Sequence, residues 1–97
     1  MRKIIWTNEA ESDYSANIDY LLKEWTISEA EEFINKAEEL LSHLKTGKIK
    51  YKASKFEGIR ESVVCKQITL FYRINENNNV ELLKFWNNYQ DKKRLKL

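Results

Sequence analysis

The sequence predicts an α+β fold in which an N-terminal helical hairpin packs on a small antiparallel β-sheet, in the order β-α-α-β-β-β. Apolar residues recur at helical spacing twice in the first half of the chain, over residues 8–24 and 28–46. Three strand-like stretches follow one another between residues 56 and 87. A chain of 97 residues has the size of one domain, so residues 1–97 are treated as a single unit.

The first helix follows a short apolar strand at residues 3–6. Thr7 or Asn8 can cap this helix, and Asn8 with Glu11 has the spacing of a capping box. The apolar side chains of the helix form one stripe, which consists of Ala10, Tyr14, Ile18, Leu21, Leu22 and Trp25.

The second helix is predicted to begin at Ser28, because Ser28 and Glu31 again have capping-box spacing. Gly47 stands where a left-handed residue would end it. The link between the two helices, around residues 25–27, is so short that they are expected to be antiparallel neighbours.

Residues 48–55 alternate lysine with less polar side chains, which is typical of an edge strand or an extended loop. Lysines on a sheet edge prevent edge-to-edge aggregation. The functional alternative is that Lys50 and Lys52 belong to a rim that attracts phosphate.

The strand over residues 68–74 has the clearest alternation in the chain. Its parity places Thr69, Phe71 and Arg73 on one face. The asparagine-rich residues 75–79 are expected to form a turn before the last strand, at residues 80–87. The first strand can join the edge of this sheet or pair beside the last strand.

The net charge of +2 combines an acidic first half with a basic second half. Residues 1–46 carry five Lys and Arg against ten Asp and Glu, whereas residues 47–97 carry twelve against five. The basic half could meet a polyanion or an acidic partner, or the two halves could be solvated faces of opposite sign.

No apolar run is long enough to span a membrane, and the N-terminus lacks the pattern of a signal peptide. A single cysteine, Cys65, is consistent with the expected reducing cytoplasm.

The sequence contains no metal-binding motif and no phosphate loop, so neither a metal nor a cofactor is expected. Cys65 and His43 lack a recognisable third group that would make them a catalytic pair, and Cys65 is expected to pack as a small apolar residue. Arg73 is either paired with a carboxylate, from Glu57, Glu61 or Glu81, or aimed at a ligand. Basic and aromatic groups remain as candidates for binding RNA or an acidic partner: Arg60, Arg73, Tyr72, Trp86, Tyr89, Lys92, Lys93 and Arg94.

Several short motifs, in their order and spacing, resemble the RelE/ParE superfamily of bacterial toxins from type II toxin–antitoxin modules. They are Trp6-Thr7 with Ala10, Tyr20-Leu21, Ala30 with Phe33, Gly58-Ile59-Arg60, Leu70-Phe71-Tyr72-Arg73-Ile74, and Phe85-Trp86-Asn87-Asn88 with Asp91. The resemblance covers essentially the whole chain. It implies a cognate antitoxin whose C-terminal segment wraps the toxin and covers its basic surface.

The resemblance also implies two modes of action. RelE-like members cut messenger RNA on the ribosome without a metal, whereas the characterised ParE-like members poison DNA gyrase. By position, Arg60 matches the basic residue that follows the family's glycine, and Tyr89 lies near the C-terminal Arg or His of the nucleases. Ser62 and Thr69 stand where the nucleases often have basic residues.

Because these two positions lack the basic residues of the nucleases, the sequence favours a ParE-like, non-nucleolytic toxin. The alternative within the family is a ribosome-dependent endonuclease with Arg60, Arg73 and Tyr89 as its catalytic residues. A third possibility is a non-toxic protein-binding module. Residues expected to bind a partner or nucleic acid are Lys50, Lys52, Trp86, Lys92, Lys93 and Arg94. Whether Trp86 belongs to the core or to a site stays open at this stage.

Overall fold

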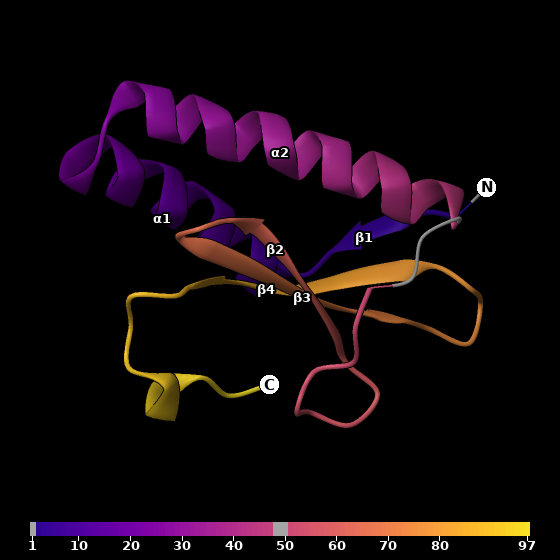
Figure 1. Cartoon of the computed structure of the whole chain (residues 1–97). Coiled ribbons are helices and arrows are strands. Elements are labelled where there is room, and N and C mark those ends of the chain that lie inside the picture. The colour runs from indigo at the N-terminus through magenta and orange to yellow at the C-terminus, as the bar shows by residue number, and fades with distance from the viewer. Residues whose placement is uncertain (1, 48–50) are drawn as a thin grey trace.

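A computed structural model describes residues 2–47 and 51–97 of the chain. Its elements follow the predicted order, with a 3₁₀ helix added near the C-terminus (Figure 1). They are β1 (Ile4–Trp6), α1 (Asn8–Glu24), α2 (Ile27–Thr46), β2 (Arg60–Cys65), β3 (Ile68–Ile74), β4 (Val80–Asn87) and the C-terminal 3₁₀ helix (Lys92–Arg94). The predicted helical hairpin on a small sheet is therefore confirmed.

The four strands form one sheet in the order β1-β4-β3-β2. The three consecutive strands β2, β3 and β4 are antiparallel, as predicted. The sheet as a whole is mixed, because β1 pairs in parallel with β4 and places Ile4 opposite Val80. The first strand thus lies both at the sheet edge and beside the last strand (Figure 1).

Both helices begin at a threonine. The Thr7 hydroxyl oxygen accepts a hydrogen bond of 3.1 Å from the Ala10 amide and also donates one of 2.7 Å to the Leu82 carbonyl, which ties α1 to β4. The α2 cap is Thr26, whose hydroxyl accepts from the Glu29 amide. The prediction that Ser28 caps α2 is therefore wrong, because Thr26 offers the same chemistry two residues earlier. Gly47 ends α2 with φ of 72°, as predicted.

The core lies between the helix pair and one face of the sheet (Figure 1). Alternate residues of β3, among them Ile68, Leu70 and Tyr72, are fully buried in it. An aromatic cluster joins the layers: the ring of Tyr14 on α1 lies 5.2 Å from Phe33 of α2 and 5.3 Å from Phe85 of β4, measured between centroids. Cys65 is buried and packs with these apolar groups, as expected.

Helix α1 also covers the part of β4 that β1 does not reach. Beyond Trp6, Asp13 accepts a hydrogen bond of 3.1 Å from the Phe85 amide, and the Asn17 amide donates one of 2.9 Å to the Phe85 carbonyl. Asp13 and Asn17 are four residues apart and so share one helix face. Together they take the place of a neighbouring strand at Phe85.

Candidate functional site on the open face of the sheet

The sheet face that points away from the helices carries alternate residues of β3 and β4. Thr69, Phe71 and Trp86 lie on this face, yet they are only 5%, 4% and 7% exposed. Two segments cover them. The loop after α2 lays the Phe56 ring 6.2 Å from the Phe71 ring, and the residues after β4 bring Leu95 to the same place.

Between these covering segments and the sheet lies a cavity of about 460 Å³. It is lined by Lys55, Glu61, Thr69, Phe71, Trp86, Asn88, Lys92 and Leu95. The two aromatic rings provide apolar surface, and the two lysines and the glutamate bring charge to the same opening. We call this the open-face cavity. A partner with apolar and negatively charged groups would match it.

Two neutral side chains in this cavity are hydrogen-bonded to each other. The Thr69 hydroxyl donates to Asn88 Oδ1 over 2.8 Å, and the Asn88 amide donates to the Lys66 carbonyl over 3.1 Å. Neither group ionises near neutral pH, so neither is suited to act as a general acid or base. These two positions therefore supply hydrogen bonds rather than acid–base chemistry.

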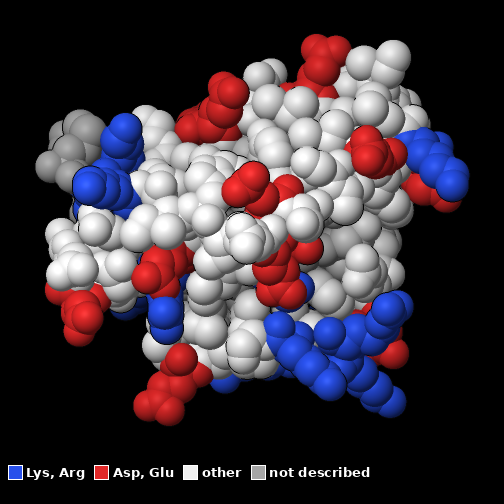
Figure 2. Space-filling view, turned by 180° about the vertical axis from the view of Figure 1, so that it is seen from behind, with Lys and Arg blue, Asp and Glu red and all other residues white. Residues whose placement is uncertain are grey.

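Basic side chains gather near the C-terminal segment. Figure 2 shows a cluster of Lys and Arg atoms at the lower right, the corner to which this segment moves when Figure 1 is turned round, whereas Asp and Glu atoms are scattered over the rest of this face. In the 3₁₀ helix, Lys92 lines the open-face cavity, whereas Lys93 and Arg94 are exposed and do not line it. Trp86 is at once buried and part of the cavity wall, so it serves both as core and as a candidate site residue.

Arg60 lies away from this cavity. It begins β2 opposite Tyr72, and its Nη1 donates a hydrogen bond of 2.7 Å to the Tyr51 carbonyl. Because Tyr72 belongs to the core between the helices and the sheet, Arg60 shares the helix side of the sheet. It lines a second cavity there.

Arg73 and Tyr89 lie in two further places. The Arg73 Nε donates to Glu81 across the β3–β4 ladder, which decides among the three carboxylates that the sequence offered. Tyr89 is 59% exposed, and its ring packs 5.7 Å from the Trp25 ring at the link between the helices. The Lys66 ammonium lies over the same Trp25 ring, 4.6 Å from its centroid. Of the three predicted catalytic residues, Arg60 and Arg73 therefore line different cavities, and Tyr89 lines neither of these two.

The lysines after α2 fall partly outside the described residues, and Lys50 is among those that do. Lys52 is exposed, and its carbonyl accepts a hydrogen bond of 3.0 Å from the Glu61 amide. Ala53 forms an isolated bridge with Arg60. Residues 51–54 therefore run along β2 as an extended loop with one bridge.

Of the residues that line the open-face cavity, sequence reasoning predicted Trp86 and Lys92 as site residues and missed the other six: Lys55, Glu61, Thr69, Phe71, Asn88 and Leu95. Glu61 could have been found, because it pairs with Phe71 across β2 and β3 and must share its face. Lys55 and Leu95 reach the cavity through loops, for which strand parity gives no indication.

Among residues 2–47 and 51–97, no three His, Cys, Asp or Glu side chains are grouped so that they could hold a metal ion. Within the same residues, no helix is both long and apolar enough to cross a membrane.

The sequence over residues 4–91 matches the family model described as the ParE toxin of the type II toxin–antitoxin system parDE. The chain belongs to the ParE toxin family. No curated protein sequence matches it significantly.

Solved structures share the fold of this ParE family member. A structure of the chromosomal ParDE toxin–antitoxin system from P. aeruginosa superposes with a TM-score of 0.73 at 17% identity, covering 90% of this chain and 96% of that one. The E. coli DinJ–YafQ complex superposes with a TM-score of 0.60 at 16% identity, covering 90% of this chain and 93% of that one. The YoeB dimer from Staphylococcus aureus superposes with a TM-score of 0.61 at 16% identity, covering 91% of this chain and 98% of that one. The chain is thus a toxin of the type II class with the RelE/ParE fold.

Proposed function

We propose that this ParE family toxin arrests growth without cutting RNA and that a cognate antitoxin neutralises it by covering the open-face cavity. The observation that carries the proposal is the neutral pair of Thr69 and Asn88 in that cavity. DNA gyrase is the target that the family resemblance implies for this mode of action.

The physical reason is the chemistry of metal-free RNA cleavage. It needs a base for the 2′-hydroxyl, an acid for the leaving oxygen, and cations for the charge that builds up on phosphorus. Arg60, Arg73 and Tyr89 are held at separate places, and their guanidinium or ring groups already contact protein groups. Thr69 and Asn88 offer no proton-transfer group between them.

One observation favours a second candidate, a RelE-like endonuclease. Glu61 lines the open-face cavity together with Lys55 and Lys92. A carboxylate can act as a general base, and two ammonium groups can stabilise a phosphorane. This mode would use none of the three predicted catalytic residues.

An induction experiment separates the two modes. The chain is expressed without antitoxin, and messenger RNA from arrested cells is examined by primer extension while a DNA-damage reporter is followed. We expect arrest with induction of the reporter and no cuts inside codons. Cuts inside codons that disappear in Glu61→Gln would replace this proposal by the endonuclease. Unimpaired growth would instead favour the non-toxic binding module.

The antitoxin partner is proposed from the family and from the charge of the cavity rim. The neighbours include the DinJ–YafQ complex and the YoeB–YefM complex. Lys55 and Lys92 beside Phe71 and Trp86 would suit a segment that alternates acidic and apolar side chains. Co-expression with the adjacent short reading frame should give a stable complex and restore growth.

A further inference from the structure

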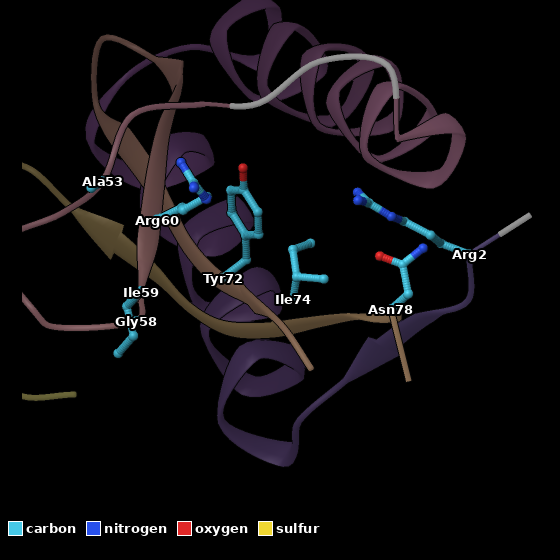
Figure 3. A pocket seen from close by; sticks show the side chains of 8 residues that line it. All are labelled: Arg2, Ala53, Gly58, Ile59, Arg60, Tyr72, Ile74 and Asn78. Atoms are coloured by element: carbon cyan, nitrogen blue, oxygen red, sulfur yellow. The ribbon is translucent and has the colours of Figure 1, made fainter. Parts of the chain in front are cut away.

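A second cavity of about 460 Å³ lies on the helix side of the sheet, where β2 begins. Figure 3 shows the residues that line this cavity, which are Arg2, Ala53, Gly58, Ile59, Arg60, Tyr72, Ile74 and Asn78. No carboxylate is among these lining residues. Its volume is in the range of sites for small molecules, roughly 300–1,000 Å³.

Two guanidinium groups reach this cavity from distant parts of the sequence. In Figure 3, Arg2 and Arg60 lie on either side of the Tyr72 ring, with Ile74 between Tyr72 and Arg2. Arg2 Nη1 donates to the Leu44 carbonyl over 3.3 Å, and Arg60 Nη1 donates to the Tyr51 carbonyl over 2.7 Å. Within the described chain, neither arginine has an acidic side chain within 4.0 Å, in contrast to Arg73, which pairs with Glu81.

Tyr72 lines the same cavity as both arginines. Burial raises the pKa of the Tyr72 phenol, while a hydrogen bond with the Tyr51 backbone and the charges of Arg60 and Arg2 pull it down. Tyr72 itself is only 1% exposed. A cavity whose wall carries two guanidinium groups, neither with a carboxylate within 4.0 Å among the described residues, has a positive potential that a dianion would neutralise.

The geometry points to a binding site for a small phosphorylated ligand with at least two negative charges, held between Arg60 and Arg2. We propose this site as separate from the open-face cavity and independent of how the toxin arrests growth. A guanidinium binds phosphate oxygens with two parallel N–H donors, and each arginine has such donors left after its single backbone bond. Phosphate fits better than one carboxylate side chain, because the cations lie at both ends of a cavity of small-molecule size. Asn78 offers a further polar contact at the same wall.

The test is a calorimetric titration of the full chain with inorganic pyrophosphate, repeated with inorganic phosphate and with a nucleoside diphosphate. The three probes distinguish a free polyphosphate from a nucleotide as the source of the phosphate. We expect saturable one-site binding that is strongest for a probe with two phosphate groups. Arg60→Gln or Arg2→Gln should weaken it about tenfold or more, equivalent to about 1.4 kcal/mol.

Two further variants keep the test decisive. Arg94→Gln removes the same charge from the exposed 3₁₀ helix and should leave the affinity within about twofold, since a distant exposed charge is screened by salt. Ala53→Glu keeps both arginines and adds a competing carboxylate to the cavity wall, so it should abolish binding. Equal weakening by Arg94→Gln would show non-specific attraction. That result, or the absence of saturable binding by the wild type, would overturn the proposal.

Discussion

Asp13 Oδ2 accepts a hydrogen bond of 3.1 Å from the backbone amide of Phe85, in the part of β4 that extends beyond its pairing with β1. Lys84, whose side chain is only 13% exposed, supports this carboxylate from 3.9 Å and lies 3.1 Å from Glu9. A helix side chain thereby meets the hydrogen-bonding need of a strand edge. Stability should depend on that contact more than on most surface groups.

Replacing Asp13 by alanine should destabilise the fold by about 1–3 kcal/mol, because the Phe85 amide loses its acceptor. Asp13→Asn keeps an acceptor oxygen at the same place and should cost clearly less. Urea unfolding gives the two free energies, and amide exchange at Phe85 should accelerate only in the alanine variant. Equal losses in both variants would show that the charge, and not the hydrogen bond, matters at this position.

The same carboxyl should make stability depend on pH. Burial raises the pKa of Asp13 above 3.8, against the opposing effects of Lys84 and the Phe85 amide. Since the folded state then binds this proton more tightly than the unfolded state, the contribution of Asp13 to stability falls as the pH rises from 3.8 through the folded pKa.

Asp13→Asn removes that titration. The stability of the Asn variant relative to the wild type should therefore increase with pH over the range just above 3.8, and stay constant at higher pH. Urea midpoints of both proteins, measured at a series of pH values, give the difference. A difference that moves the other way would mean that Lys84 outweighs burial.

Lys92 and Lys93 form a matched pair, because both are exposed lysines of the 3₁₀ helix and only Lys92 lines the open-face cavity. If the antitoxin covers that cavity, Lys92→Ala should slow association with it several-fold, and Lys93→Ala should change it little. Surface plasmon resonance at two salt concentrations measures both rates. Identical effects of the two changes would place the antitoxin elsewhere.

Tyr89→Phe keeps the ring against Trp25 and removes only the hydroxyl. The proposed non-nucleolytic mode predicts undiminished growth arrest from this variant. If the hydroxyl served as an acid or base in RNA cleavage, the cleavage rate would fall by roughly 10²–10⁴. Tyr89→Ala is the control for the ring itself and should cost about 0.5–1.5 kcal/mol of stability.

Arg73→Ala should also leave growth arrest intact, since the Arg73 side chain is exposed, pairs with Glu81 and does not line the open-face cavity. A plate assay of induced cells with a matched expression level is sufficient. Loss of arrest, with the folded fraction unchanged by circular dichroism, would return Arg73 to the functional site.

Most of the fold follows from local patterns that the sequence displays. The apolar stripe through Ala10, Tyr14 and Leu21 and the left-handed stop at Gly47 each correspond to one element of the structure. The sequence does not distinguish Thr26 from Ser28 as the cap of α2, because both hydroxyls can accept the capping hydrogen bond and only the backbone conformation selects Thr26.

The candidate site was harder to predict, because it depends on which face each strand shows and on two loops. Strand parity put Thr69 and Phe71 together, whereas the arrival of Lys55 and Leu95 depends on loop paths. Asp13 and Asn17 are visible in the sequence only as polar residues four apart beside an apolar stripe. This spacing is compatible with a polar contact at the edge of the core, but it does not identify Phe85 as the partner.

The parallel pairing of β1 with β4 has a consequence for how the toxin folds during its synthesis. Ile4 to Trp6 are made before both helices, whereas their partners, Val80 to Leu82, are made only after β2 and β3. The two helices are adjacent in sequence and pack on each other, so the hairpin can form early, whereas the sheet cannot close before β4 is available. We therefore expect the toxin to reach its folded form only after β4 has been synthesised, which leaves time for an antitoxin to bind it as it folds.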